Sequence, residues 1–104
     1  MKKRLLITRR LPEAVEVRAN RDYEVVQNED DHQMTTDEVV EKAADVDAIL
    51  ITITDKMRED VILALPEHIK VLSTFSIGYE HIDLEAAKAR GIEVGNAPHG
   101  VTVA

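Results

Sequence analysis

Five short apolar runs, rich in Val and Ile, recur along the chain and alternate with segments that carry helix signals. The runs occupy residues 5–7, 23–26, 48–53, 71–73 and 92–94. Each has the length and the β-branched content of a strand. Parallel strands need long crossover connections, so strands that alternate with helices form βαβ units. The sequence therefore predicts an α/β protein built on a parallel sheet.

The segments between these runs carry helix end signals. Pro12 is suited to the first position of a helix, and Thr35 with Glu38 forms a capping-box pattern at the start of another. Asp83 is a suitable N-cap, and Gly91 stands where a helix would end with a residue in the left-handed conformation. These signals predict helices between consecutive strands.

The run at 48–53 is apolar at nearly every position, as expected of a strand covered by helices on both faces. The run at 23–26 alternates more and includes Glu24, which places it at an edge of the sheet. Right-handed crossovers and a buried third strand favour a flavodoxin-like, doubly wound sheet of five parallel strands. The predicted strand order is 2-1-3-4-5, in three α/β/α layers.

Composition limits the partners and the compartment. A chain of 104 residues with 44% hydrophobic residues can form one domain with its own core. It has no cysteine, which is typical of a reducing compartment, and its net charge of −7 repels nucleic acid and anionic membranes. The basic start at residues 2–4 precedes too short an apolar run for a signal peptide, and no stretch approaches the roughly 20 apolar residues of a membrane span. We expect a cytoplasmic protein that binds neither nucleic acid nor membrane.

In an open parallel sheet, ligands bind beyond the carboxyl ends of the strands, so the loops there are the candidate sites. The loop after the first strand, residues 8–12, has no glycine and cannot be a nucleotide phosphate loop. Arg9 and Arg10 would be able to receive an anion, but a plain surface pair is the favoured interpretation. Residues 28–32 form an acidic turn that we expect to be solvated.

The loop after the third strand contains Thr54, Asp55 and Lys56, which combine a hydroxyl, a carboxylate and an ammonium group. One interpretation is that Thr54 or Asp55 only organises the turn into the next helix. The other is that these residues contact a ligand. The sequence leaves both interpretations open.

The loop after the fourth strand is the longest, and it contains Ser76, Ile77 and Gly78. Gly78 permits a positive φ, so the N–H groups of these three residues would be able to form a concave site for a small carboxylate. The alternative is a long connection in which Gly78 is only a turn residue. The carboxylate site is thus a hypothesis at this point.

The histidines offer no obvious catalytic or metal site. His32, His68, His81 and His99 show no i, i+4 pair, so a metal cluster would need the fold to assemble it. A hydrogen bond at a helix start explains His81 with Asp83 better than catalysis does. The chain has no Gly-x-Ser-x-Gly elbow and no paired-carboxylate signature. We predict no metal site and no catalytic residue in these 104 residues.

Several segments resemble the N-terminal part of the D-2-hydroxyacid dehydrogenases, most closely the branch of glyoxylate/hydroxypyruvate reductases. These segments are 8–13, 54–56, 71–83 and 89–98. They cover most of the chain in the right order. The stretch from Ser76 through Gly78-Tyr79 and His81-Ile82-Asp83 to Arg90-Gly91-Ile92 is specific to that family.

The resemblance implies a two-domain, NAD(P)-dependent oxidoreductase that interconverts a small 2-oxo acid and its D-2-hydroxy acid. It implies that Ser76, Ile77 and Gly78 hold the substrate carboxylate by backbone amides. It places Thr54, Asp55 and Lys56 beside the same cleft and Thr102 near the nicotinamide. The family's catalytic histidine, with its arginine and acidic partner, lies later in the family sequence, as does the glycine-rich dinucleotide fingerprint.

The chain departs from the family pattern at Ala97, where threonine is usual, and it ends at Ala104 without a Gly-x-Gly-x-x-Gly fingerprint. We therefore expect residues 1–104 to be the substrate (catalytic) domain, truncated before the NAD(P)-binding domain. Alone it would bind no NAD or NADP, lack catalytic activity and form a weak homodimer. The alternatives are a stand-alone flavodoxin-like binding module and a structural fragment without ligand affinity.

Overall fold

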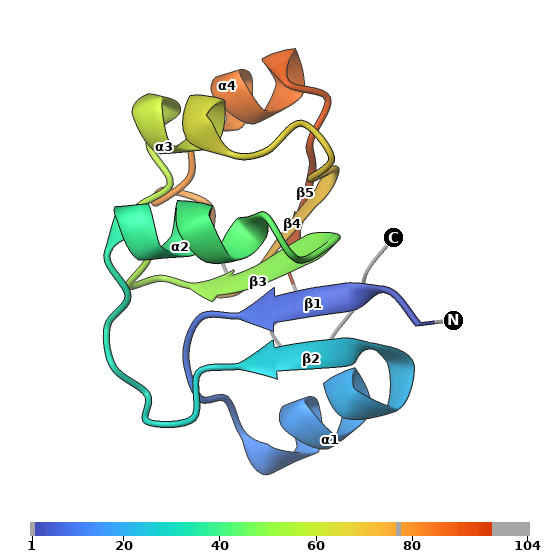
Figure 1. The fold of residues 1–104 in the computed structure, drawn as a ribbon. Helices are drawn as coiled ribbons and strands as arrows, with labels where there is room; N and C mark the ends of the chain where they lie inside the picture. The colour runs from blue at the N-terminus through green and yellow to red at the C-terminus, as the bar shows by residue number, and fades with distance from the viewer. Residues whose placement is uncertain (1, 77, 97–104) are drawn as a thin grey trace.

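One all-parallel sheet of five strands, in the order β2-β1-β3-β4-β5, organises the fold (Figure 1). The computed structural model describes residues 2–76 and 78–96. Its elements are β1 (Arg4–Ile7), α1 (Glu13–Asp22), β2 (Glu24–Gln27), α2 (Thr36–Ala43), β3 (Ala48–Thr52), α3 (Glu59–Ala64), β4 (Val71–Phe75), α4 (Leu84–Ala89) and β5 (Glu93–Asn96). The predicted fold class and strand order are confirmed. No helix in this described part has the length and apolar character of a membrane span.

The helices cover the sheet unequally. In Figure 1, α2, α3 and α4 lie along one face and α1 lies on the other. The chain steps from β1 to β2 in one direction and from β2 through β5 in the other, so right-handed crossovers put the first helix opposite the rest. The three predicted layers therefore consist of one helix, the sheet and three helices.

Alternate residues of the central strands build two separate cores. Ile49 and Ile51 face the cluster under α2, α3 and α4, whereas Ala48 and Leu50 face the cluster under α1. All four are buried, which confirms that β3 is covered on both sides. The predicted run was one residue too long, because Ile53 lies beyond the strand and is 58% exposed.

Two predicted helix starts differ in detail from the structure. Pro12 is the N-cap of α1 and has an extended ψ of 144°, so the helix begins one residue later than the sequence predicted. Thr35 caps α2 as predicted, since its Oγ1 accepts a 3.1 Å hydrogen bond from the Glu38 N–H. The Glu38 carboxylate does not complete a capping box, because it bonds to His32 instead. His32 is thus the partner of the Glu38 carboxylate, in place of the backbone N–H at the helix start.

Both ends of α4 follow the prediction. Oδ1 of Asp83 accepts a 3.0 Å hydrogen bond from the Ala86 N–H. At the other end Gly91 has φ of 70°, and its N–H donates to the Lys88 carbonyl. The next N–H, that of Ile92, donates to the Ala87 carbonyl at 2.9 Å. These two hydrogen bonds satisfy carbonyls in the last turn of the helix and direct the chain into β5.

Candidate functional site

Two of the loops predicted to bind ligand are held together at the carboxyl edge of the sheet. They follow β3 and β4, which are neighbouring parallel strands and end in the pair Thr52 and Phe75. Beyond the strands, the Met57 N–H donates to the His81 carbonyl at 2.8 Å, and the Asp83 N–H donates to the Met57 carbonyl at 2.8 Å. The 54–56 loop and the 76–78 loop are therefore parts of one edge.

Asp55 organises the turn after β3. It is only 4% exposed, and its Oδ2 accepts hydrogen bonds from the Thr8 hydroxyl at 2.6 Å and from the Thr52 N–H at 3.0 Å. Burial of a carboxylate is tolerated where donors surround it in this way. The contacts favour the turn interpretation for Asp55.

Thr54 and Lys56, on either side of Asp55, are exposed. The Thr54 Oγ1 lies 2.7 Å from the Thr52 hydroxyl and accepts a 3.2 Å hydrogen bond from Nη1 of Arg9. The Lys56 ammonium donates only a long 3.4 Å bond to the Ile53 carbonyl. Of the three residues predicted in this loop, Thr54 and Lys56 are therefore the ones that a ligand can reach.

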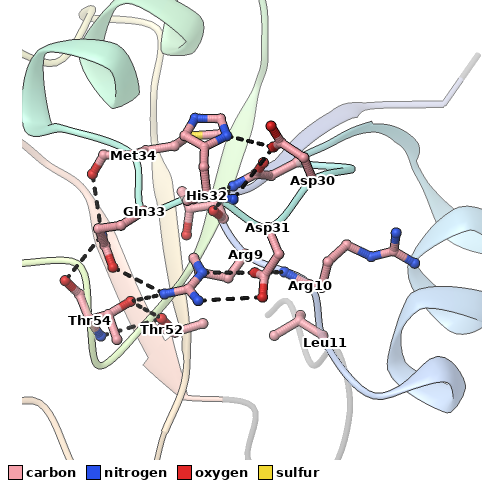
Figure 2. A network of polar contacts seen from close by, with 12 residues as sticks. Arg9, Arg10, Leu11, Asp30, Asp31, His32, Gln33, Met34, Thr52 and Thr54 are labelled. Carbon is pink, nitrogen blue, oxygen red and sulfur yellow. Dashed lines mark hydrogen bonds and ion pairs between the residues drawn. The ribbon is translucent and has the colours of Figure 1, made fainter.

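Arg9 joins three loops of this edge, as Figure 2 shows. Its Nε and Nη2 donate to the two carboxylate oxygens of Asp31 at 2.8 and 3.4 Å. Its Nη1 donates to Oε1 of Gln33 at 3.0 Å and to Thr54. The bond from Arg9 holds the pKa of Asp31 below its usual value. Residues 29–32 are exposed, as the sequence predicted, and Arg9 lies at the surface. The sequence did not predict that Arg9 pairs with Asp31 and so connects these loops.

The neighbouring Arg10 is also paired. It donates to the Glu16 carboxylate from Nε and Nη2, both at 2.9 Å, and its backbone N–H donates to Asp31 at 2.8 Å. The bond from Arg10 lowers the pKa of Glu16. The loop after β1 contains no glycine, both of its arginines pair with carboxylates, and the Thr8 hydroxyl already donates to Asp55. It therefore does not fit the phosphates of a dinucleotide. The structure therefore agrees with the exclusion of a nucleotide loop here.

The 76–78 loop is described at its two ends. The Ser76 Oγ donates to the Gly78 carbonyl at 2.9 Å and lies 2.8 Å from the Thr74 Oγ1. Ile77 lies outside the described residues, and so does Thr102. The φ angle of Gly78 depends on an atom of Ile77, so the predicted amide site stays a prediction. A Cβ added at Gly78 would lie 2.8 Å from Oε2 of Glu80, at the end of a flexible side chain.

His81 is the residue whose role sequence reasoning missed. It is 3% exposed, and its Nε2 lies 2.8 Å from the Thr74 Oγ1 on β4. The helix-start hydrogen bond that the sequence predicted for the pair of His81 and Asp83 is made by Asp83, which caps α4, whereas the His81 side chain bonds to Thr74. Burial lowers the pKa of the His81 imidazole, with a further contribution from the nearby Lys56 ammonium. The i, i+7 spacing from Thr74 is no local signal, so only the fold reveals this pair.

A pocket of about 230 Å³ lies beside the loop after β3. It is lined by Gln33, Met34, Thr35, Thr36, Val39, Thr54, Asp55, Lys56 and Met57. A wider depression of about 780 Å³ lies over the outer face of α1, far along the chain from these loops, and it is more open to solvent. Polar groups from the loops after β2 and β3 converge on the smaller pocket, so we place the candidate site there and along the adjoining carboxyl edge.

Among the residues that the structure describes, no three His, Asp or Glu side chains gather in a way that would hold a metal ion. The exposed polar groups of the candidate site include the Thr54 hydroxyl, the Gln33 amide and the Lys56 ammonium, beside the buried Asp55 carboxylate. Hydrogen-bond donors of this kind bind small oxyanions such as carboxylates.

Comparison with known proteins shows the family. Residues 5–104 match the family described as D-isomer specific 2-hydroxyacid dehydrogenase, catalytic domain. The chain is 58% identical to a glycerate dehydrogenase from Hyphomicrobium methylovorum over 99% of its own length and 32% of that protein. It is 33% identical to a glyoxylate reductase from Thermococcus onnurineus, over 98% of the chain and 30% of that relative.

A solved structure gives the same result. The glyoxylate/hydroxypyruvate reductase of Sinorhizobium meliloti, NADPH-dependent and solved with NADP and malonate, superposes with a TM-score of 0.71. It is 26% identical, and the match covers 94% of this chain and 29% of that one. The chain thus spans about a third of the length of the relatives it matches. Since the family match covers nearly every residue and the strand order agrees with it, the chain belongs to the D-isomer specific 2-hydroxyacid dehydrogenase family and corresponds to its catalytic domain.

Proposed function

We propose that this chain is the substrate-binding domain of an NAD(P)-dependent dehydrogenase that interconverts a small 2-oxo acid and its D-2-hydroxy acid. The substrate class is that of glyoxylate and hydroxypyruvate. The substrate carboxylate binds at the carboxyl edge of the sheet, between the 76–78 loop and the 54–56 loop.

The observation that carries this proposal is the connection between these two loops through Met57. Its N–H and carbonyl bond to the His81 carbonyl and to the Asp83 N–H, so the β3 and β4 loops keep a fixed separation. A fixed pair of loops with exposed donors is suited to an anion of two or three carbon atoms. Lys56 lies on the 54–56 loop and supplies an exposed positive charge at this edge.

The activities of the relatives support the proposed substrate class. The two sequence relatives above are a glycerate dehydrogenase and a glyoxylate reductase, and the Sinorhizobium enzyme was solved with malonate, a dicarboxylate. Glycerate and glyoxylate share a carboxylate next to the carbon that changes oxidation state. A domain that fixes this carboxylate therefore serves both directions of such a reaction.

We further propose that these 104 residues bind substrate and do not transfer hydride alone. Hydride transfer needs a nicotinamide held against the substrate and a general acid to protonate the product oxygen. The loop after β1 does not fit a dinucleotide, and His81, which bonds to Thr74 near this edge, is buried. The domain's own contribution is to bind and orient the substrate.

The test is a titration of the ¹⁵N-labelled chain with glyoxylate, followed by amide chemical shifts. We expect shifts confined to residues 52–56 and 74–80, and a dissociation constant on the order of millimolar, about 4 kcal/mol. NADH oxidation by the same sample with glyoxylate or hydroxypyruvate should stay at the buffer rate. Dispersed amide signals before titration establish that the chain is folded.

Gly78→Val is the informative variant, because a β-branched side chain stiffens the loop and displaces the Glu80 carboxylate that lies beside Gly78. It should abolish the glyoxylate shifts. Gly95→Val on β5 is the matched control and should retain them. Glyoxylate binding by Gly78→Val as tight as by the parent would refute this location. Shifts spread over the whole surface, or none, would favour a stand-alone module of another function.

A further inference from the structure

A chain of hydrogen bonds leads from the buried His81 to the 76–78 loop. The His81 Nε2 lies 2.8 Å from the Thr74 Oγ1, and the Thr74 Oγ1 lies 2.8 Å from the Ser76 Oγ. The Ser76 Oγ then donates to the Gly78 carbonyl at 2.9 Å. Three side chains thus connect the core to the backbone of the loop.

The last link determines the direction of every other link. A carbonyl oxygen only accepts, so the single hydroxyl proton of Ser76 is used on Gly78. The proton between Thr74 and Ser76 must therefore come from Thr74. The Thr74 Oγ1 has then spent its proton, so His81 must donate to it from Nε2. The imidazole carries its proton on Nε2, and the whole chain of bonds runs one way, toward the loop.

The other ring nitrogen is consistent with this assignment. The Nδ1 of His81 is buried and has no hydrogen-bond partner among the described residues. An unpartnered lone pair in the core costs free energy, and an unpartnered N–H would cost more. Burial and the nearby Lys56 ammonium both lower the pKa of His81, which favours a neutral ring.

We propose that His81 is a positioning residue for the carboxylate-binding loop, which it holds in shape through Thr74 and Ser76. The inference rests on the proposed function in that the loop is taken to bind the substrate carboxylate. His81 does not touch the substrate; through Thr74 and Ser76 it fixes the Gly78 carbonyl and thereby restricts the backbone of the loop. A histidine that merely fills the core would have no effect on the loop.

The first measurement concerns the tautomer and needs no ligand. A long-range ¹H–¹⁵N spectrum of the imidazole at pH 8 should show a pyrrole-type Nε2 and a pyridine-type Nδ1 for His81. A pyrrole-type Nδ1 would overturn the proposal, because Thr74 would then donate to Nε2 and Ser76 to Thr74, and no proton would remain for the Gly78 carbonyl. His68, which bonds to two backbone carbonyls through Nε2, provides an internal reference for a donating Nε2.

The second measurement uses variants in the same glyoxylate titration. His81→Leu and Thr74→Val each break one link, and each should weaken glyoxylate binding about fivefold. The double variant should bind no more weakly than either single variant, since both remove the same chain of bonds. His81→Gln, whose side-chain amide can donate from a similar position, should restore binding to within about twofold of the parent.

The outcomes separate this inference from the proposed function. If the parent chain does not bind glyoxylate, the proposed function fails, and the positioning role is read from the amide exchange of Gly78 and Tyr79. Faster exchange there in Thr74→Val, with β1 and β2 unchanged, would support the role. Unchanged amide exchange in Thr74→Val would overturn the positioning role. If the parent binds glyoxylate, equally tight binding by the variants would overturn it too. Thr74→Val, which keeps the shape of the side chain, gives the answer even if His81→Leu fails to fold.

Discussion

The Thr8 hydroxyl donates a 2.6 Å hydrogen bond to Oδ2 of Asp55, and both side chains are buried. The pair links the ends of β1 and β3, which lie side by side in the sheet. The same carboxylate oxygen accepts from the Thr52 N–H, so Asp55 closes its own turn while it holds the loop after β1. Several predictions about stability and binding depend on contacts of this kind.

Removal of the Asp55 carboxylate should be costly. Asp55→Ala leaves the buried Thr8 hydroxyl and the Thr52 N–H without an acceptor, and it should lower the free energy of unfolding by about 3 kcal/mol. Thr8→Val should cost about 1 kcal/mol, because it removes a donor and leaves the carboxylate its second bond. Urea unfolding of both variants and of the double variant should give a coupling of about 1–2 kcal/mol. Strict additivity would mean that the 2.6 Å bond contributes nothing to stability.

Arg9→Lys should loosen the edge without unfolding the domain. Lysine keeps the charge but cannot place three donors on Asp31, Gln33 and Thr54 at once. Amide exchange around Asp31 and Thr54 should become several-fold faster, and that of the β3 amides should not change. Arg21→Lys is the control, because Arg21 pairs only with its neighbour Asp22 on the outside of α1. Equal effects of the two substitutions would mean that the bonds from Arg9 to Asp31, Gln33 and Thr54 do not hold these loops together.

The His32 imidazole should make stability depend on pH. It bonds to Asp30 at 2.6 Å and to Glu38 at 2.8 Å, and these two carboxylates raise its pKa above the ordinary value of 6.5. A histidine with a raised pKa in the folded state stabilises fully below the unfolded pKa and loses this effect as pH rises through the folded pKa. His32→Gln should therefore be less stable than the parent at pH 6, and the difference should shrink toward pH 9.

The measurement for His32 is urea unfolding at pH 6, 7.5 and 9. His68→Gln is the matched control, since the His68 ring faces the carbonyls of Ala43 and Val46 rather than carboxylates. A difference between parent and His32→Gln that stays constant over this range would show that the two ion pairs do not depend on the charge of the ring.

Gly91→Ala isolates a backbone effect at the end of α4. A Cβ at Gly91 would meet nothing within 4 Å, so its whole cost comes from the positive φ of 70°. We expect a loss of about 1 kcal/mol in the free energy of unfolding. At Gly95 a Cβ is equally free of contacts and no positive φ is present, so Gly95→Ala should be neutral within about 0.5 kcal/mol. Thermal unfolding of the two variants gives the comparison directly.

Opposite charges on the two loops should tune the affinity for glyoxylate. Lys56→Met removes the ammonium group of the 54–56 loop. Binding should weaken only about threefold, because water screens the attraction between exposed charges. Glu80→Gln removes a carboxylate that lies close to Gly78 and should tighten binding by a similar factor. Both effects should decline at 0.5 M salt. A loss of affinity in Glu80→Gln would mean that its carboxylate supports the loop rather than repels the ligand.

Local signals predicted much of this fold, because they act within one turn of helix or one strand. The Asp83 cap and the Gly91 end each depend on partners a few residues away, and both were found. The strand β4 runs two residues beyond its predicted end, since Thr74 and Phe75 pair with Ile51 and Thr52 on another strand. Such pairing leaves no mark in the sequence of β4 itself.

The site was predictable in outline and not in its contacts. The positions of residues 54–56 and 76–78 after neighbouring strands indicated that these two loops lie together, because parallel strands end at the same edge. The bonds that hold those loops join residues far apart in sequence, as from Thr8 to Asp55 and from Arg9 to Asp31. Sequence reasoning had no means to choose Asp31 over the neighbouring acids, and so it treated this acidic turn as solvated.

The strand order also determines which part of the sheet is able to assemble first. Each of the neighbouring pairs β3–β4, β4–β5 and β1–β2 is separated along the chain by a single helix. The contact between β1 and β3 instead spans two helices and a strand, so its formation carries the largest loop-closure entropy. The unit of β3, β4 and β5 and the β1–α1–β2 unit should therefore form early. Their docking through Leu5, Leu6 and Ile7 should be the slow step of folding. Truncation of these three side chains would then slow folding more than it speeds unfolding.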